Sequence, residues 1–303
     1  MDKTVLVTGG AGFIAKHTIN ALITDGYNVI AADRKQRPTG FFAKYYQTDI
    51  TGSDLENIFL ENKIDYIIHL SALPSVSESV KNPQKDCTDN YYATVNVCSL
   101  GKKYGVSKIV FSSSAAVYAH PKYLPVDEAH PNEFISPYAI TKYASESFIK
   151  YCGLDYIIYR YSNVYGEGQD SQGEAGVVAK FFELMTNNQP VHIYGTGEQT
   201  RDFIYVKDVA KANILALKTD IKNEVINVST NTKVTVNELF NTIKEVLRYN
   251  LEPNYTDPRE GDIEHSVLDN QKFVRLFNFV PSVDLKAGIE SMAKILSRRG
   301  SYG

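Results

Sequence analysis

The chain has 303 residues, of which 43% are hydrophobic and 22% are charged, which is typical of a soluble globular protein and excludes disordered and fibrous classes. Its 32 lysines and arginines and 35 aspartates and glutamates give a formal net charge of −3, which argues against nucleic-acid binding through bulk positive charge. A chain of this length is expected to form one compact body with a second lobe, or two domains.

None of the three cysteines belongs to a C-x-x-C pair, and their number is odd, so the sequence encodes neither a disulfide framework nor a zinc knuckle. The six histidines show no metal-ligand spacing, and we expect no metal site. The first residues lack the long apolar core of a secretion signal, and no window approaches 18 uninterrupted apolar residues. We therefore expect a cytoplasmic protein with neither a membrane nor nucleic acid as a partner.

Predicted strands and helices alternate along the first half of the chain. A β-branched run at residues 4–8 ends in glycines, a helical pattern covers 13–22, and a second β run follows at 28–33. Further strand-like runs at 65–70, 108–112 and 155–161 alternate with helical stretches at 88–104 and after Pro137. Several runs are continuously apolar, as a parallel sheet covered on both faces requires. The pattern predicts an α/β fold with a doubly wound parallel sheet of the Rossmann type.

The composition changes beyond Gly166. Glycine, glutamine, aspartate and asparagine become frequent, and the apolar runs between them are shorter. A helical stretch at 207–217 and a β run at 224–228 then indicate a return to the sheet. We predict a dinucleotide-binding domain of residues 1–165 plus about 202–230, and a smaller, discontinuous substrate-binding lobe of about 166–201 plus 231–303.

A glycine-rich loop joins the first predicted strand to the first predicted helix. Its sequence, Gly9 to Ala15, satisfies the pattern G-x-G-x-x-A on Gly10, Gly12 and Ala15. Such a loop lets the backbone approach a pyrophosphate, whose charge meets the N-terminus of the helix. Asp33 ends the second strand 21 residues after Gly12, which is the spacing of a ribose-binding acid. The strand, loop, helix and acid together predict a dinucleotide site.

The charge of Asp33 favours NAD over NADP, because a carboxylate accepts hydrogen bonds from ribose hydroxyls and repels a 2′-phosphate. The basic residues Arg34, Lys35 and Arg37 follow directly. They leave a 2′-phosphate clamp open as an alternative, although a solvated basic turn is the simpler interpretation. A P-loop is excluded, because residues 15–17 do not match its G-K-[ST] ending.

Tyr138 and Lys142 lie four residues apart at the start of a predicted helix, with Ser136 suited to its N-cap and Pro137 to its first position. The two side chains therefore share one helical face. A tyrosine of pKa about 10 becomes a base near neutral pH only if its phenolate gains about 4 kcal/mol of stabilisation. A neighbouring ammonium and a nicotinamide cation are expected to supply it. With 21 tyrosines in the chain, a surface pair of this spacing is the alternative.

Three serines, Ser112 to Ser114, stand at the end of the predicted strand 108–112. This is the carboxyl edge, at which open α/β sheets bind their ligands. Taken without the other motifs, a polar strand end or a helix cap explains these hydroxyls equally well.

The glycine loop, Asp33, Ser114, Tyr138 and Lys142 together resemble the extended short-chain dehydrogenase/reductase family, and within it the nucleotide-sugar 4-epimerases of the UDP-glucose 4-epimerase type. The resemblance spans nearly the whole chain and includes the stretches 49–50, 69–72, 160–166, 194–202 and 259–262. The chain departs from the family pattern at three alanines, none of which replaces a reacting group: Ala15, Ala116 and Ala119.

The resemblance implies NAD as the cofactor, a UDP-sugar as the substrate and a homodimer. It implies that the catalytic residues are Ser114, Tyr138 and Lys142. It assigns cofactor contacts to Gly9, Gly12, Phe13, Ile14, Asp33, Asp49, Ile50, Leu70, Ser71, Ala72, Tyr138, Lys142, Tyr161 and Ser162. It assigns substrate contacts to Ser114, Tyr138, Asn163, Tyr194, Arg201, Arg259, Asp262 and Ser266. The chemistry agrees, because arginines suit phosphate oxygens and a tyrosine ring suits a base, although an exposed ion pair remains the alternative for each arginine.

The reaction that the resemblance implies is 4-epimerisation through a 4-keto sugar. Tyr138 is expected to remove the proton of the 4-hydroxyl while hydride passes to NAD, and the keto sugar then turns over and takes the hydride back on its other face. Dehydratases and decarboxylases of the family carry an acid or an acid pair directly after the active hydroxyl residue. This chain has Ala115 and Ala116 there, which favours hydride transfer alone.

Ser266 is expected to border the sugar 2-position, where the family excludes an N-acetyl group with a bulky aromatic residue. Its small side chain predicts that UDP-N-acetylglucosamine is accepted beside UDP-glucose. The alternatives are another nucleotide-sugar enzyme of the family, such as a UDP-glucuronate 4-epimerase, a 4,6-dehydratase or a reductase, and a non-catalytic NAD-sensing protein. The last is disfavoured, because all three expected catalytic residues are present.

Overall fold

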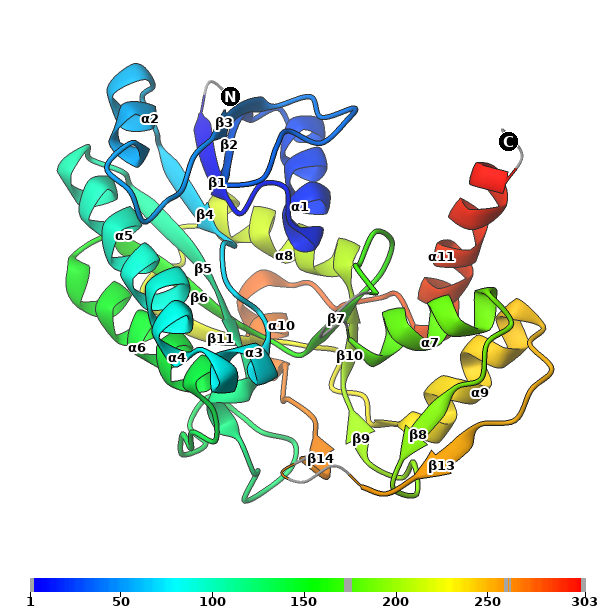
Figure 1. The fold of residues 1–303 in the computed structure, drawn as a ribbon. Coiled ribbons are helices and arrows are strands. Elements are labelled where there is room, and N and C mark those ends of the chain that lie inside the picture. Colours follow the sequence, from blue (N-terminus) through cyan, green and yellow to red (C-terminus); the bar gives the residue numbers. More distant parts are fainter. Residues whose placement is uncertain (1–2, 172–175, 259–260, 262, 301–303) are drawn as a thin grey trace. The chain divides into compact units, whose positions relative to one another are not determined.

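The computed structural model describes residues 3–171, 176–258, 261 and 263–300 (Figure 1). The chain forms two compact units. Unit 1 consists of Met1–Ala119, Asn132–Tyr161 and Val209–Ile226, and unit 2 consists of His120–Pro131, Ser162–Asp208 and Asn227–Gly303. Both units are therefore assembled from segments that are distant in the sequence.

The segment His120–Pro131 belongs to unit 2, whereas the sequence analysis placed it in the first domain. Its Val126 makes a backbone hydrogen bond of 2.8 Å to Val267 and accepts one of 2.8 Å from Asp269. The Asn227 side chain also donates to the Val126 carbonyl over 2.9 Å. These long-range bonds connect the segment to the C-terminal part of the chain, and no local sequence pattern predicts them.

A seven-stranded sheet forms the centre of unit 1, in the order β3-β2-β1-β4-β5-β6-β11. The strands are β1 (Thr4–Thr8), β2 (Asn28–Asp33), β3 (Lys44–Gln47), β4 (Tyr66–His69), β5 (Lys108–Ser114), β6 (Asp155–Tyr161) and β11 (Glu224–Val228). Every pairing from β3 across to β6 is parallel. The strand order reverses between β1 and β4, which is the place where doubly wound sheets bind dinucleotides.

Helices cover both faces of this sheet. Figure 1 shows α2 (Leu55–Glu61), α5 (Ala93–Lys103) and α6 (Pro137–Cys152) on one face, and α1 (Phe13–Thr24) and α8 (Val206–Lys218) on the other. The remaining helical segments of this part of the chain are α3 (Val76–Lys81), α4 (Pro83–Asp86), the π-helix η1 (Cys87–Tyr92) and the 3₁₀-helix η2 (Ala115–Tyr118). Burial on both faces explains why the strands are apolar along their whole length.

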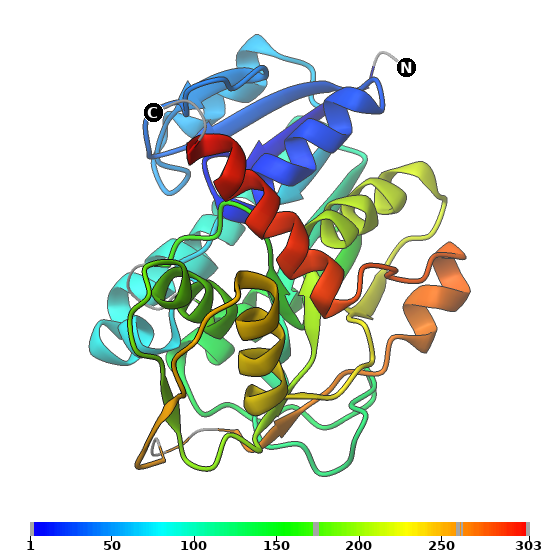
Figure 2. The same cartoon turned by 90° about the vertical axis from the view of Figure 1, so that its right-hand side faces the viewer.

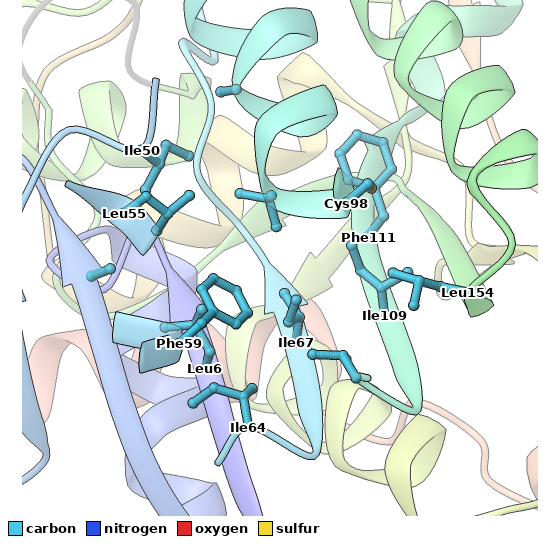
Figure 3. Packing of buried hydrophobic residues seen from close by; sticks show 14 of the residues in the cluster. Leu6, Ile50, Leu55, Phe59, Ile64, Ile67, Cys98, Ile109, Phe111 and Leu154 are labelled. Carbon is cyan, nitrogen blue, oxygen red and sulfur yellow. The ribbon is translucent and has the colours of Figure 1, made fainter. Parts of the chain in front are cut away.

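The core of unit 1 joins the sheet to its helices. Figure 3 shows Leu6, Ile67 and Ile109 of three neighbouring strands beside Phe59 of α2 and Cys98 of α5. Each of the five is at most 5% exposed. At about 25 cal/mol per Å² of apolar surface, burying side chains of this size contributes about 1.5–3 kcal/mol each, which fixes the sheet whose edge carries the site.

Unit 2 contains short strands and a cluster of helices. Its elements are β7 (Asn163–Tyr165), α7 (Val177–Thr186), β8 (His192–Tyr194), β9 (Thr200–Arg201), β10 (Phe203–Tyr205), β12 (Val234–Thr235), α9 (Val236–Leu247), β13 (Asn254–Thr256), β14 (His265–Ser266), α10 (Gln271–Phe277) and α11 (Leu285–Gly300). Phe181 of α7, Phe240 of α9 and Ile289 of α11 belong to one buried cluster, and Figure 2 shows these three helices in a turned view. The strands pair as β10 with β7, β13 with β8, and β9 between β12 and β14.

The structure confirms the predicted Rossmann-type sheet. The strands at 4–8, 28–33 and 155–161 have the predicted bounds, and the helix after Pro137 begins at that residue. The stretch 88–104, predicted as one helix, contains most of the π-helix η1 before α5. None of the helices in the described ranges is both long enough and apolar enough to span a membrane.

Candidate active site

The glycine loop lies between β1 and α1, at the carboxyl edge of the sheet. Gly9 has φ of +70°, a left-handed conformation that glycine adopts without strain. A Cβ on Gly9 would lie 2.8 Å from the backbone nitrogen and Cα of Ser71, and a Cβ on Gly10 would lie 2.7 Å from the Cβ of Ala31. Both glycines are therefore required by close packing of the loop on neighbouring segments.

The loop fits the pyrophosphate of a dinucleotide. Gly12 is the N-cap of α1 and caps the helix with no side chain, and the first turn, which includes Phe13 and Ile14, carries no acidic residue. The first N–H groups of α1 and the positive end of its dipole therefore remain available to an anion. A Cβ on Gly12 would lie 2.9 Å from the Gly9 carbonyl oxygen, so a larger residue would alter this turn.

Asp33 lies at the end of β2, beside the glycine loop. Its carboxylate accepts hydrogen bonds from the backbone N–H of Ala11 at 3.0 Å and of Lys35 at 2.9 Å. Arg34 forms an ion pair of 2.9 Å with Asp89 of η1. The arginine closest to Asp33 is thus occupied by a carboxylate, which favours the simpler interpretation of the basic turn over a 2′-phosphate clamp.

The other expected cofactor segments follow β3 and β4. Asp49 accepts hydrogen bonds from the Thr51 backbone and hydroxyl, and the backbone bond is the main reason why its pKa lies below the usual value. Asn96 of α5 donates to the carbonyl of Ile50 over 2.7 Å. Residues 70–72, half-buried, follow β4 directly, so this segment and the glycine loop flank the point where the strand order reverses.

Tyr138, Lys142 and Ser114 converge near the carboxyl end of β5. Ser136 caps α6 by accepting a hydrogen bond from the Ala139 N–H at 3.2 Å, which fixes the start of the helix. The ammonium of Lys142 donates to the Ser112 carbonyl over 2.7 Å and lies 5.8 Å from the centre of the Tyr138 ring. Ser114 hydrogen-bonds to the Tyr138 side chain. The three expected catalytic residues therefore form one cluster within unit 1.

Burial dominates the proton affinities of this cluster. Burial raises the pKa of Tyr138 to about 12, against a hydrogen bond from Ser114 and with a smaller upward contribution from Asp86. Burial lowers the pKa of Lys142 to about 8, and Asp86 and Glu146 oppose that change. In the protein without its cofactor, desolvation of the phenolate is the largest effect on the Tyr138 pKa, and the lowering expected from Lys142 together with a nicotinamide cation stays a prediction.

Tyr161 lies beside this cluster as the last residue of β6, in register with Ser114. Its hydroxyl donates to Asn213 of α8 over 2.7 Å, and the Asn213 amide donates to Thr18 of α1 over 3.2 Å. Ser162 and Asn163 follow directly in unit 2.

The sequence analysis missed a polar cluster on η1. Asn90 accepts a hydrogen bond from the Leu73 N–H at 2.7 Å and donates to Asp86 over 2.7 Å. Thr141, between Tyr138 and Lys142 on α6, donates to the second oxygen of Asp86 over 2.6 Å. These bonds link the segment after β4 to the helix of the catalytic cluster. The only signal in the sequence was a polar run in a stretch predicted to be helical.

A buried ion pair behind the cluster was also missed. Arg160 of β6 donates to both carboxylate oxygens of Glu146 of α6, at 2.9 and 2.6 Å, and to the Tyr118 hydroxyl at 2.9 Å. Ser113 donates to the same carboxylate over 2.5 Å. The network fixes α6 against the ends of β5 and β6. Glu146 lies one turn after Lys142, so local spacing would pair it with Lys142, and no local signal pairs it with Arg160.

Asp202 is a buried acid that hydrogen-bonds to two of the expected site residues of unit 2, Ser162 and Asn163. It is 1% exposed and accepts hydrogen bonds from the Ser162 hydroxyl and from the backbone and hydroxyl of Thr230. Its backbone carbonyl accepts a hydrogen bond of 2.9 Å from the N–H of Asn163, which is exposed at the start of β7. Burial raises the pKa of Asp202, and these hydrogen bonds oppose that change.

Arg201 and Ser266 are paired residues of β9 and β14 in unit 2. Ser266 is half-buried, and Arg201 donates to the Thr200 carbonyl over 2.9 Å. Tyr194, 38% exposed, ends β8. Arg259 and Asp262 lie outside the described residues. Within the ranges that the structure covers, no group of three histidine, cysteine, aspartate or glutamate side chains is placed to hold a metal ion.

Comparison with known families agrees with this site. A family model described as "NAD dependent epimerase/dehydratase family" matches residues 5–229, which is most of the chain. The chain belongs to this family. The match runs from β1 through the glycine loop and α6 to the residue after β11, so it includes the whole catalytic cluster.

Individual members of the family are similar over nearly their full length. A putative UDP-glucose 4-epimerase of Methanocaldococcus jannaschii is 44% identical, over 94% of this chain and 96% of that protein. The structure of a UDP-glucose 4-epimerase from Thermotoga maritima with UDP-glucose has a TM-score of 0.94 at 39% identity, over 98% and 99% of the two chains. A UDP-N-acetylglucosamine 4-epimerase from Methanobrevibacter ruminantium M1, in complex with UDP-N-acetylmuramic acid, has a TM-score of 0.92 at 36% identity, over 98% and 99%.

Proposed function

We propose that this protein is an NAD-dependent epimerase that inverts C4 of a UDP-hexose. The observation that carries the proposal is the cluster of Ser114, Tyr138 and Lys142 at the carboxyl edge of a sheet whose first strand leads into a dinucleotide loop. Its substrates are UDP-glucose and UDP-galactose, and we extend them to the N-acetylated pair. The similarity to UDP-sugar 4-epimerases along nearly the whole chain supports this choice.

Tyr138 handles the proton of the sugar 4-hydroxyl in this proposal. Its Oη takes that proton when the carbinol is oxidised and returns it when the ketone is reduced, while the Ser114 hydroxyl orients the same oxygen. NAD, when bound, accepts the hydride from C4 and gives it back. Because the hydride returns, the net reaction is an isomerisation.

The raised pKa of Tyr138 sets how much the phenolate must be stabilised before it can act as a base. Lowering the value from about 12 to neutrality needs about 7 kcal/mol of preferential phenolate stabilisation. The value of about 12 already includes the hydrogen bond from Ser114, so the ammonium of Lys142 together with the positive nicotinamide of bound NAD would have to supply this stabilisation. In the protein alone Tyr138 therefore keeps its proton, so the base forms only when the site is loaded.

The residues after Ser114 argue against neighbouring reactions of the family. Ala115 and Ala116 begin η2, and Ala116 donates its backbone N–H to the Ser114 hydroxyl oxygen over 3.2 Å. At these two positions no side chain can protonate a leaving hydroxyl, which disfavours a 4,6-dehydratase. UDP-glucuronate 4-epimerisation uses the same proton and hydride steps and is the second candidate.

We assign nucleotide binding to residues of unit 2. Arg201 and Arg259 hold the diphosphate, Tyr194 and Asp262 contact the uridine, and Asn163 contacts the diphosphate. Ser266 borders the sugar 2-position, where its small side chain leaves room for an N-acetyl group. The pairing of Ser266 with Arg201 supports a common role. Apart from Ser162, the proposed dinucleotide contacts belong to the first unit, together with the sugar contacts of Ser114 and Tyr138, whereas the contacts to the nucleotide of the substrate belong to the second. We also propose a cytoplasmic homodimer.

Incubation of the purified protein with single UDP-sugars tests the proposal. UDP-glucose, UDP-N-acetylglucosamine, UDP-glucuronate and dTDP-glucose are supplied separately, without added cofactor, and the products are identified by NMR. We expect the C4 epimers of the first two sugars, formed with NAD that co-purifies. A 4-keto-6-deoxy product, or turnover of UDP-glucuronate alone, would assign the protein to another branch of the family.

A further inference from the structure

Asp86, at the end of α4, is a fully buried carboxylate to which the proposed reaction gives no role. One oxygen accepts a hydrogen bond from Asn90 at 2.7 Å, and the other accepts one from Thr141 at 2.6 Å. Among the residues that the structure covers, no cation lies within ion-pair distance of it. A buried carboxylate that has only neutral hydrogen-bond partners is costly unless a charge compensates it.

Lys142 is a buried cation without an ion-pair partner among the described residues. Its side chain is also buried, and its ammonium makes one hydrogen bond to the described part of the chain, to the Ser112 carbonyl at 2.7 Å. An ammonium that is held by one neutral acceptor tends to lose its proton. Asp86 binds the hydroxyl of Thr141, which is the residue before Lys142 on α6. Both buried groups therefore lie at the same turn of this helix.

We propose that Asp86 is a positioning residue whose buried carboxylate is the counter-charge that keeps Lys142 an ammonium ion. The proposal rests on the proposed function only for its consequence in catalysis. Thr141 and Asn90 fix the carboxylate, and Asn90 also binds the Leu73 N–H, so the counter-charge is held by the segment that follows β4. Lys142 then remains able to bind a ribose hydroxyl and to favour the Tyr138 phenolate.

The other charged groups around Lys142 are already neutralised. Glu146 is shared by two nitrogens of Arg160. His69 is neutral, because burial and the Lys142 charge lower its pKa to about 3. Asp89, which acts on Asp86, is paired with two cations of its own, Arg34 and Lys85. Asp86 is thus the carboxylate whose charge remains for Lys142.

Proton affinities support this geometry. Asp86 is the largest influence that opposes the lowering of the Lys142 pKa, ahead of Glu146. It also raises the pKa of Tyr138. Burial raises the pKa of Asp86, whereas Thr141, Lys142 and Asn90 oppose that rise. Asp86 therefore favours a resting state with a neutral Tyr138 hydroxyl and a charged Lys142.

NMR of the NAD-loaded protein that carries [ε-¹³C]lysine tests the proposal directly. The resonance that is missing in Lys142→Met belongs to Lys142, and its titration is followed between pH 5 and 11. We expect Asp86→Asn to lower the Lys142 midpoint by about one unit or more. Thr141→Val is the matched control, because it removes a hydrogen bond to Asp86 but keeps the carboxylate. Its midpoint is expected to stay within a few tenths of wild type.

Equal Lys142 midpoints in wild type and Asp86→Asn would overturn the proposal, as would an equally large shift in Thr141→Val. Should Asp86→Asn fail to fold, the double variant Asp86→Leu/Thr141→Val removes the carboxylate together with its hydroxyl donor and carries the same expectation. The alkaline limb of the pH profile of kcat/KM should move with the midpoint. Failure of the wild type to turn over any UDP-sugar would reject the proposed function, while the NMR titration still decides the role of Asp86.

Discussion

Removing Glu146 while keeping Arg160 should destabilise unit 1 strongly. The Arg160 side chain is 4% exposed and that of Glu146 is 0% exposed, and Glu146 accepts three hydrogen bonds from Ser113 and Arg160. In Glu146→Leu the guanidinium stays buried with its bond to the Tyr118 hydroxyl but without a carboxylate. Breaking such a buried pair costs about 3–5 kcal/mol. At about 2 °C per kcal/mol for a chain of this size, the Tm should fall by about 6–10 °C.

Thermal unfolding of the NAD-loaded protein, followed by circular dichroism, measures this loss. The double variant Glu146→Leu/Arg160→Met lacks both members of the buried ion pair and is expected to recover at least half of the loss, since apolar replacements of buried ion pairs are often neutral. The Ser113 hydroxyl then lacks its acceptor, which limits the recovery. A Glu146→Leu protein within about 2 °C of wild type, or a double variant as unstable as the single one, would refute the reasoning.

Four further results are expected. Tyr138→Phe should lower kcat by about 10²–10⁴-fold while calorimetry still detects NAD binding, and near-normal epimerisation would remove Tyr138 from its role. Because the pKa of His69 is lowered to about 3 by burial and Lys142, protons bind preferentially to the unfolded chain below about 6.5. Stability should therefore fall by about 2 kcal/mol on going from pH 7.5 to pH 5, and denaturant titrations should show a smaller fall in His69→Gln. Gly9→Ala places a Cβ 2.8 Å from Ser71 at a left-handed residue. The free energy of unfolding should fall by about 1–2 kcal/mol from the backbone alone, and the Tm and the affinity for NAD should decrease with it. Ser266→Tyr should depress turnover of UDP-N-acetylglucosamine selectively, whereas equal loss on both sugars would contradict the assignment.

The parts of the fold that depend on local pattern could be predicted from the sequence. Continuous apolar runs fix β1, β2 and β6, because strands buried on both faces carry no polar alternation. Ser136 and Pro137 define the first turn of α6, so the common face of Tyr138 and Lys142 follows from local chemistry. The glycine loop follows from its strand and helix context in the same way.

The remaining features depend on long-range contacts. Asp86 and Thr141 are 55 residues apart in the sequence, and nothing local pairs them. The place of residues 120–131 in unit 2 depends on the bonds of Val126 to Val267 and Asp269. The pKa of Tyr138 could not be predicted either, because its main cause is the depth of burial, which the spacing of Tyr138 and Lys142 does not encode.

The most direct test of the account follows the hydrogen on C4. UDP-glucose that carries deuterium at C4 is converted in unlabelled water without added cofactor, and the UDP-galactose formed is analysed by NMR and mass spectrometry. Because the hydride is removed and returned within one active site, the account predicts that the deuterium is retained at C4 of the product. Loss of the label to water, or a product without deuterium at C4, would contradict it.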